Sequence, residues 1–493
     1  MKTKYLRMAN EQLSALLLRL LQASVLLLAA SSAQAGVVFT NLYSFTGTND
    51  GANPYAGLVQ GSDGYFYGTT YSGGTNNLGT VFKISTNGAY TSLYSFTGTK
   101  DGANPSAGLV QGSDGNFYGT TYNGGTNNYP FLFHTNNYGT VFKISTNGAL
   151  TSLYSFGSIH NAYDVLDGYN PSAPLVQGSD GYFYGTTYSG GIGAGTVFKI
   201  STNGALTTYS LTGIFDGSNP AAGLVQGSDG YFYGTTESGG QTSPNYNGAG
   251  AVFQISTNGA KYTTGWYEFP LVDSETQAGA NPQATLVQGS DGYFYGTTYR
   301  GGYGSIQGSG PGTVFKISTN WVLTSLYTFG GSRGALPAAG LVQGSDGYFY
   351  GTTYYGGGKG YGTVFRMSTN GALTTLYSFS GTNDGANPRA VLVQGSDGSF
   401  YGTTSAGGTN NLGTVFRMTL LPGPPQLAIT VSGANVILTW PTFPAGFALE
   451  FTTNLVSPVV WITNYSRSQT IIGDQNVVTD PISVTQMFFR LKQ

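Results

Sequence analysis

Few residues of this sequence have side chains suited to acid–base, nucleophilic or metal chemistry. Its 493 residues include 21 acidic side chains, two histidines and no cysteine. Many of the acids belong to repeated motifs: Gly-Ser-Asp-Gly occurs seven times, and the Asp of Asp-Gly-x-Asn-Pro recurs five times. Residues that every repeat shares serve the scaffold. A specific site therefore requires residues that one repeat has and the others lack.

The fourth and fifth repeats contain residues of this kind. Glu237 stands at the end of an expected strand, where five other repeats have Tyr. Arg300 follows the same position in the next repeat, and the connector between these repeats contains Asp273 and Glu275. A pair of carboxylates suits glycoside hydrolysis or cation binding. Charges of solvated loops are the simpler interpretation.

The two histidines, His134 and His160, lie in insertions between strands and have no partner motif, which is typical of surface residues. The sequence also lacks nucleophile-elbow, phosphate-loop and zinc-protease motifs. We therefore assign no catalytic residue and no metal ligand. The candidate binding residues are Glu237, Asp273, Glu275, Arg300, His134 and His160.

The Asp of Asp-Gly-x-Asn-Pro has two interpretations. Calcium prefers the oxygens of Asp and Asn, so these loops are candidate calcium ligands. Each loop offers one carboxylate, however, whereas a calcium loop usually offers several, and a short Asp side chain is well suited to capping a turn. We expect turn capping and no cofactor, with calcium as the alternative, at Asp50, Asp101, Asp167, Asp216 and Asp384.

Each repeat contains four strand-like segments, which in the first copy are 56–60, 65–71, 80–85 and 91–96. Aromatic and β-branched residues fill these segments. The Asp-Gly and Asn-Gly pairs between them supply the positive φ of tight hairpins. Four antiparallel strands in a repeat of this length are typical of a β-propeller blade.

The ends of the repeat array predict how a ring closes. The third strand, Gly-Thr-Val-Phe or Gly-Ala-Val-Phe, occurs seven times, the last copy ending at Met418. The fourth strand also occurs seven times, but its first copy is 42–45, before the first Gly-Ser-Asp-Gly. The N-terminal strand therefore completes the seventh blade, which removes an unpaired edge. The first strand of each repeat is then innermost.

This strand order places the variable loops together. In a four-stranded meander, the loop after strand two and the connector to the next blade open on one face, and the Gly-Ser-Asp-Gly turns open on the other. The insertions 129–138, 158–167, 241–248 and 272–279 all fall on the first face. Variable loops on a rigid scaffold commonly form binding sites.

Composition and the N-terminus indicate an exported protein. Lys2, Lys4 and Arg7, the apolar run 20–30 and Ala33-Gln34-Ala35 predict a signal peptide over 1–35. A membrane anchor is the alternative, but the uncharged run is too short to span a bilayer comfortably. With 8% charged residues and a net charge of −2, nucleic acid is not an expected partner.

The repeat motif Leu-Val-Gln-Gly-Ser-Asp-Gly-x-Phe-Tyr-Gly-Thr-Thr, followed by Gly-Gly and Gly-Thr-Val-Phe-Lys-Ile-Ser-Thr-Asn-Gly, resembles the GloVer tandem-repeat family of exported bacterial proteins. The resemblance covers about 37–419. It implies export and a variable C-terminal module, often for surface attachment or sorting, and it implies no activity. Here that module is 426–493, after a Pro-rich linker at 420–425.

The sequence thus predicts an all-β protein with a signal peptide (1–35), a seven-bladed β-propeller (36–419), a linker (420–425) and a small β-sandwich (426–493). We expect a secreted or cell-surface, non-enzymatic scaffold that binds glycans or proteins through the loop-insertion face. Its partners would be extracellular polysaccharide or a surface protein, with no transmembrane span after signal cleavage. The alternative is an extracellular carbohydrate-active enzyme using carboxylates of blades four and five.

Overall fold

The computed structural model divides the chain into two units. Phe39–Thr419 form the larger unit, and Leu420–Gln493 with Met1–Val38 form the smaller. The backbone is described for residues 36–127, 138–161, 163–240, 248–259, 261–270, 278–302, 310–421, 427–432, 434–441, 447–453, 459–462, 469–472, 475–481 and 487–492. Among these residues, no helix is long and apolar enough to cross a membrane.

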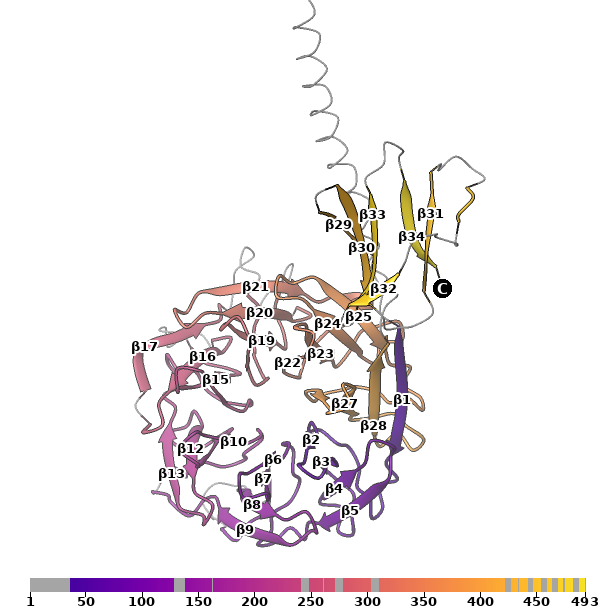
Figure 1. Cartoon of the computed structure of the whole chain (residues 1–493). Helices are drawn as coiled ribbons and strands as arrows, with labels where there is room; N and C mark the ends of the chain where they lie inside the picture. The colour runs from indigo at the N-terminus through magenta and orange to yellow at the C-terminus, as the bar shows by residue number, and fades with distance from the viewer. Residues whose placement is uncertain are drawn as a thin grey trace, which may run out of the picture. The chain divides into compact units, whose positions relative to one another are not determined.

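Seven four-stranded antiparallel sheets make up the larger unit in the described part of the chain. They stand around a common axis in a propeller-like arrangement, with the first strand of each sheet innermost (Figure 1). A 3-10 turn, η2 (Gly331–Arg333), lies in the connector before the sixth sheet.

The first three sheets comprise β2 (Val59–Gln60), β3 (Phe66–Thr70), β4 (Thr80–Ile84) and β5 (Tyr90–Ser95); β6 (Val110–Gln111), β7 (Phe117–Thr121), β8 (Thr140–Ile144) and β9 (Leu150–Ser155); and β10 (Val176–Gln177), β11 (Phe183–Thr187), β12 (Thr196–Ile200) and β13 (Leu206–Ser210). The next three comprise β14 (Val225–Gln226), β15 (Phe232–Thr236), β16 (Ala251–Ile255) and β17 (Lys261–Glu268); β18 (Val287–Gln288), β19 (Phe294–Thr298), β20 (Thr313–Ile317) and β21 (Leu323–Thr328); and β22 (Val342–Gln343), β23 (Phe349–Thr353), β24 (Thr363–Met367) and β25 (Leu373–Ser378). The seventh comprises β26 (Val393–Gln394), β27 (Phe400–Thr404), β28 (Thr414–Leu420) and β1 (Val37–Ser44).

The second strand of every sheet, Phe-Tyr-Gly-Thr-Thr, is buried along its whole length. Its central residue must be glycine. A Cβ on Gly68 would lie 2.6 Å from the ring of Phe82 and 2.7 Å from Leu58 Cδ2. The motif thus makes room for the aromatic ring of the third strand and the leucine that precedes the first.

Neighbouring sheets are joined by one repeated aromatic stack. The ring of Tyr67 in β3 stacks on Phe117 of the next sheet with 4.0 Å between centroids. The same geometry crosses from the last sheet to the first, where Tyr401 stacks on Phe66, also at 4.0 Å. Consecutive residues of the second strand, such as Phe66 and Tyr67, therefore contact the sheets on opposite sides, because successive side chains of a β-strand point to opposite faces.

The Gly-Ser-Asp-Gly turns form hydrogen bonds to these tyrosines and to the glutamines of the neighbouring sheets. Asp63 Oδ2 accepts a hydrogen bond from the Tyr67 hydroxyl at 2.6 Å, and Asp63 Oδ1 accepts one from Tyr65 N at 3.2 Å. Ser62 N donates to Gln111 Oε1 at 3.0 Å, and Gln111 Nε2 donates to Ser62 Oγ at 3.2 Å. We call this exchange the Gln–Ser belt. It joins all seven turns on one face through Gln60, Gln111, Gln177, Gln226, Gln288, Gln343 and Gln394.

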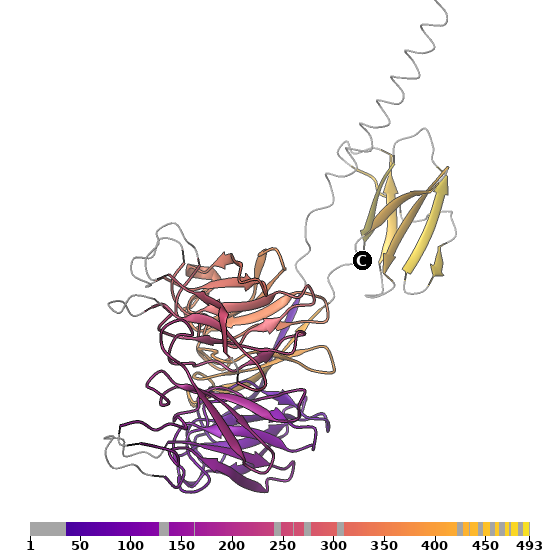
Figure 2. The same cartoon turned by 90° about the vertical axis from the view of Figure 1, so that its left-hand side faces the viewer.

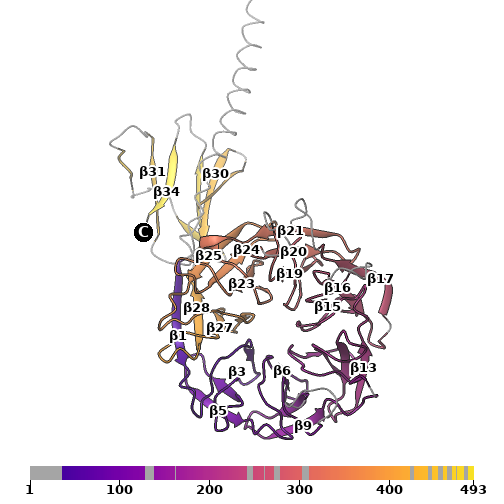
Figure 3. The same cartoon turned by 180° about the vertical axis from the view of Figure 1, so that it is seen from behind.

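The N-terminal strand closes the last sheet, as the offset in the repeat count predicts. β1 pairs with β28 at the rim (Figures 1 and 3). Phe45 N bonds to Gly413 O at 3.1 Å and Leu421 N bonds to Gly36 O at 2.8 Å, so the two strands run in opposite directions. The belt also crosses this seam, because Ser396 N donates to Gln60 Oε1 at 2.9 Å.

The innermost strand is shorter than the sequence predicts. The expected segment 56–60 pairs only at β2 (Val59–Gln60). Ala56 instead offers its carbonyl to a side chain of the neighbouring sheet, the hydroxyl of Thr403, at 2.9 Å. Near the axis, contacts between sheets thus replace the hydrogen bonds of a strand ladder.

The smaller unit is also built of β-strands, drawn in yellow in Figure 2. Its described strands are β29 (Ala428–Ser432), β30 (Asn435–Pro441), β31 (Ala448–Thr452), β32 (Thr470–Ile472), β33 (Gln475–Pro481) and β34 (Phe488–Lys492). They pair in the orders β29-β30-β33-β32 and β31-β34. Leu438, Trp440, Leu449 and Val478 form its core. Trp461 is half-buried, and the Arg490 guanidinium lies 4.2 Å from its ring centroid.

Candidate functional site

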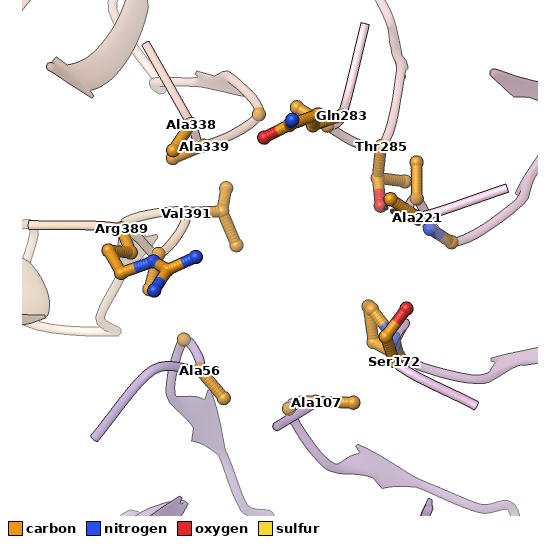
Figure 4. A pocket seen from close by; sticks show the side chains of 18 of the residues that line it. Ala56, Ala107, Ser172, Ala221, Gln283, Thr285, Ala338, Ala339, Arg389 and Val391 are labelled. Carbon is orange, nitrogen blue, oxygen red and sulfur yellow. Dashed lines mark hydrogen bonds between the residues drawn. The ribbon is translucent and has the colours of Figure 1, made fainter. Parts of the chain in front are cut away.

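An axial cavity of about 550 Å³ lies where the seven sheets meet (Figure 4). It is lined by the segments that precede the innermost strands and by several residues at the ends of second strands. By strand direction, these ends lie opposite the Gly-Ser-Asp-Gly turns. The connector 158–167 also lies at this end, since Gly191 N, after β11, bonds to Val165 O at 2.8 Å. The other three predicted insertions fall wholly or mainly outside the described residues.

A repeated Asn-Pro turn fixes the cavity wall. In six of the seven sheets the Asn before the Pro has a φ between 54° and 59°, and Leu336 takes its place in the sixth sheet at φ 54°. The Asn side chain then bonds to the residue that ends the second strand of the preceding sheet. For example, Asn281 Nδ2 donates to Glu237 O at 2.8 Å. The residue after the Pro is thereby turned toward the axis.

The seven residues after Pro are of five different types, although the turns that present them are alike. All of them line the cavity, and Figure 4 shows several of them around its opening. They are Tyr55, Ser106, Ser172, Ala221, Gln283, Ala338 and Arg389. We call this set the post-proline ring. Equivalent positions around one cavity thus carry different side chains, and such differences can form a specific site on a symmetric scaffold.

Tyrosines surround the same opening one layer away. Tyr122 and Tyr188 end their second strands at the cavity wall, and Tyr71 stacks on Tyr55 with 4.9 Å between centroids. All of these rings are half-buried. Burial, with the nearby charge of Glu237 second, raises the pKa of Tyr188 to about 12, so its hydroxyl stays a neutral donor. The rim thus offers aromatic faces and hydroxyl groups together.

Glu237 lies in the cavity wall and is already engaged by its neighbours. Its Oε2 accepts a hydrogen bond from the Tyr188 hydroxyl at 3.2 Å, and its Oε1 accepts one from Gln283 Nε2 at 2.8 Å. These partners come from the preceding and the following sheet. Among the described residues that line the cavity, Glu237 is the one carboxylate.

Arg389 lies in the part of the wall formed by the sixth, seventh and first sheets. Its guanidinium is 4.7 Å from the ring centroid of Tyr55 and 5.6 Å from that of Tyr354. These are cation–π distances. The side chain is exposed to the cavity, and Figure 4 shows it directed into the opening.

The other residues predicted as a site are not gathered here. Arg300 is exposed, with its guanidinium 5.9 Å from the Tyr299 ring, and is not part of the cavity lining. His160 is an exposed residue of the third connector, bridged to Val165. Asp273, Glu275 and His134 lie outside the described residues. The structure therefore places one of the six in the cavity and two elsewhere.

Sequence reasoning missed Arg389, Gln283 and Tyr55. Their signal was available, because they occupy the position of the Asn-Pro-x-Ala segment that varies most, with Tyr, Ser, Ala, Gln and Arg in different repeats. A single repeat does not show that this position faces the cavity, because its direction is set by contacts with the neighbouring sheet.

The Asp of Asp-Gly-x-Asn-Pro caps a turn in each of the five connectors. Asp50 Oδ2 accepts from Thr46 N and from the Tyr43 hydroxyl, both at 2.8 Å, and Asp50 Oδ1 accepts from the Thr46 hydroxyl at 2.7 Å. Asp101, Asp167, Asp216 and Asp384 accept comparable bonds. Within the described part of the chain, no group of three or more His, Asp or Glu side chains is arranged to hold a metal ion.

Comparison with solved structures finds distant similarities. Hydrazine synthase from Kuenenia stuttgartiensis is 14% identical, with a TM-score of 0.49 over 78% of this chain and 100% of that one. A periplasmic gluconolactonase from Pseudomonas aeruginosa is 16% identical, with a TM-score of 0.41 over 75% of this chain and 99% of that one. Both scores are below 0.5, so we assign the fold from strand pairing. No curated protein matches the chain.

The repeat pattern itself matches a family model. The model of the Gloeobacter/Verrucomicrobia repeat matches three overlapping stretches, 30–164, 133–302 and 267–437. Together they cover all seven sheets described above. The chain belongs to the Gloeobacter/Verrucomicrobia repeat family.

Proposed function

We propose that this protein is an exported, non-enzymatic β-propeller that binds a glycan at its axial cavity, on the face opposite the Gly-Ser-Asp-Gly turns. The observation that carries the proposal is the chemistry of the cavity rim. Half-buried tyrosines surround an opening in which Glu237, Gln283 and Arg389 are the polar anchors. Aromatic faces pack against the C–H faces of sugar rings, and planar polar groups bond to their hydroxyls.

The domain assignment forms part of this proposal. Each of the seven sheets is taken as one blade, with the N-terminal strand completing the seventh. The smaller unit is taken as a β-sandwich that attaches or sorts the protein after removal of a signal peptide at 1–35. In support, the same aromatic stack and the same Gln–Ser exchange recur at every junction between neighbouring sheets, including the one at the seam.

Binding is favoured over hydrolysis because Glu237 has no second carboxylate beside it in the described lining and is already hydrogen-bonded. A glycosidase commonly uses two carboxyl groups, about 5–5.5 Å apart in retaining enzymes and about 6.5–9.5 Å apart in inverting ones. The described lining has one, and both of its oxygens already accept hydrogen bonds from Tyr188 and Gln283. A carboxylate held in this way orients a binding surface.

A glycan array with the mature chain (36–493), run beside a polysaccharide-degradation assay, tests the proposal. We expect binding without turnover, and we expect the Tyr188→Ala and Gln283→Ala variants to lose it. Tyr163→Ala is the matched control, because Tyr163 is 84% exposed in a connector and does not line the cavity. Turnover that Glu237→Gln abolishes would establish the carbohydrate-active enzyme instead. Absence of binding to any glycan would refute the proposal.

A further inference from the structure

Arg389 is unusual among the residues of the cavity wall. It is the one cation at the seven post-proline positions. Its guanidinium is held between the rings of Tyr55 and Tyr354, at 4.7 and 5.6 Å from their centroids. Cation–π contacts at these distances restrict the motion of a guanidinium and leave its N–H groups available. Much of the entropy that a mobile arginine would lose on binding is therefore already lost.

Among the residues that the structure describes, no acidic side chain pairs with the N–H edge of Arg389. The ion pairs of the described chain join other residues, and none involves Arg389. Glu237, the described carboxylate of the lining, belongs to the fourth sheet and is engaged by Tyr188 and Gln283, whereas Arg389 leads into the seventh. The cavity thus has a positive group and a negative group on different sectors of its wall, and they do not neutralise each other.

We propose that the axial cavity selects an acidic sugar, and that Arg389 binds the carboxylate of a uronic acid residue. The planar guanidinium matches a carboxylate through two parallel hydrogen bonds. Tyr55 and Tyr354 flank the bound group, and Glu237 with Gln283 lies on another sector, where hydroxyls of the same chain are accepted. This inference rests on the proposed glycan-binding function and specifies its ligand class.

A sulfate ester on a neutral sugar presents a related oxyanion. Sulfate is tetrahedral, and such groups are commonly held by more than one cation. The described lining contains a single one, Arg389. The flat carboxylate, which one guanidinium binds through two parallel hydrogen bonds, is therefore the better match. Titration with a uronate oligomer and with a sulfated neutral oligomer distinguishes the carboxylate from the sulfate ester.

Calorimetric titration of the mature chain with three oligosaccharides tests the inference. The probes are a hexuronic acid oligomer, the same oligomer with its carboxyl groups reduced to alcohols, and a sulfated neutral oligomer of equal length. We expect the uronate to bind about tenfold or more tightly than its reduced form, the range for a hydrogen bond to a charged group. Its affinity should fall as salt is added.

Variants at Arg389 complete the experiment. Arg389→Gln should weaken binding of the uronate much more than binding of the reduced oligomer, so that the two oligomers then bind with similar affinities. Arg389→Lys should restore only part of the preference for the uronate, because lysine keeps the charge but cannot bind bidentately. Arg333→Gln, at an exposed connector residue outside the lining, is the control, and melting curves establish that each variant is folded.

Each outcome bears on a different claim. Equal binding of the uronate and its reduced form, or uronate binding that Arg389→Gln leaves unchanged, would overturn the inference while glycan binding stands. Tighter binding of the sulfated oligomer would overturn the assignment of a carboxylate. If none of the three oligomers binds and the glycan array is also empty, the proposed function itself fails, and this inference fails with it.

Discussion

Replacing Leu336 with asparagine should stabilise the protein. Leu336 has φ 54°, a left-handed conformation that is costly for a branched side chain and that asparagine adopts more readily. The other six sheets all have Asn here, and its amide bonds to the strand end of the preceding sheet, as Asn104 Nδ2 does to Tyr71 O at 2.9 Å. The backbone bonds of Leu336 match those of these Asn residues, with Leu336 N to Pro311 O at 2.7 Å. An amide at 336 would therefore reach Tyr299 O.

The expected gain follows from three contributions. Relief of the left-handed conformation contributes roughly 1 kcal/mol, and the new hydrogen bond contributes about 1 kcal/mol. Loss of apolar contacts by the half-buried leucine costs up to about 1 kcal/mol. The net gain is about 1 kcal/mol. At about 2.1 cal/mol/K per residue, a unit of about 380 residues unfolds with roughly 0.8 kcal/mol/K, so the melting temperature should rise by about 1 °C.

Three variants measured side by side by scanning calorimetry separate these contributions. Leu336→Ala removes the leucine and adds nothing, Leu336→Gly also relieves the backbone, and Leu336→Asn relieves it and adds the amide. We expect melting temperatures to rise in that order. At a regular repeat, Asn104→Leu should lower the melting temperature by about 1–3 °C, since roughly 2 kcal/mol is lost and apolar contacts of the leucine offset up to about 1 kcal/mol of it. If Leu336→Asn melts no higher than Leu336→Ala, the amide does not make the bond and the reasoning is wrong.

Two further predictions concern the seam and the smaller unit. Deleting 37–45 should leave β28 as an exposed edge and make the protein aggregate or melt at lower temperature, and a deletion variant that stays monomeric and melts like the parent would contradict this. In the smaller unit, the Glu450 carboxyl is 2% exposed and pairs with Arg490 at 2.7 Å and Lys492 at 3.5 Å. Burial opposes its ionised form, but the Arg490 hydrogen bond and the Lys492 charge outweigh this and lower its pKa below 4.5. A lowered pKa stabilises the folded state above the unfolded-state pKa, and this stabilisation is lost as the pH falls through the folded-state value. The melting-temperature deficit of Glu450→Gln should therefore be constant from neutral pH to about 4.5 and shrink below it, and a deficit that does not change with pH would contradict the linkage.

The scaffold was accessible to sequence reasoning because its signals repeat. The Asp-Gly and Asn-Gly turns gave the hairpins, and the offset between third and fourth strands gave the pairing of β1 with β28. The Asp of each Asp-Gly-x-Asn-Pro segment caps its turn as expected. These features depend on residues close together in the chain or on the number of copies of each strand, and both are visible in a sequence.

The site was less accessible because it depends on contacts between repeats. Glu237 is visible in the sequence as a break in the repeat pattern, but its observed partners, Tyr188 and Gln283, come from the sheets on either side. The direction of Arg389 is fixed by an asparagine turn, whose geometry involves a carbonyl of the preceding sheet. The Gln of Leu-Val-Gln cannot be distinguished from an ordinary strand residue in the sequence, because its partner is the Gly-Ser-Asp-Gly turn of the preceding sheet.

The uniformity of the junctions between sheets bears on how this ring could be rearranged. The seam has the same aromatic stack and the same Gln–Ser exchange as every other junction. Gly36 and Leu421, the two ends of the ring, are joined by a hydrogen bond of 2.8 Å. The point at which the chain opens can therefore change without changing the order of the sheets around the axis. A circular permutant, with these ends linked and a new opening in another connector, would place the same seven post-proline residues around the same cavity.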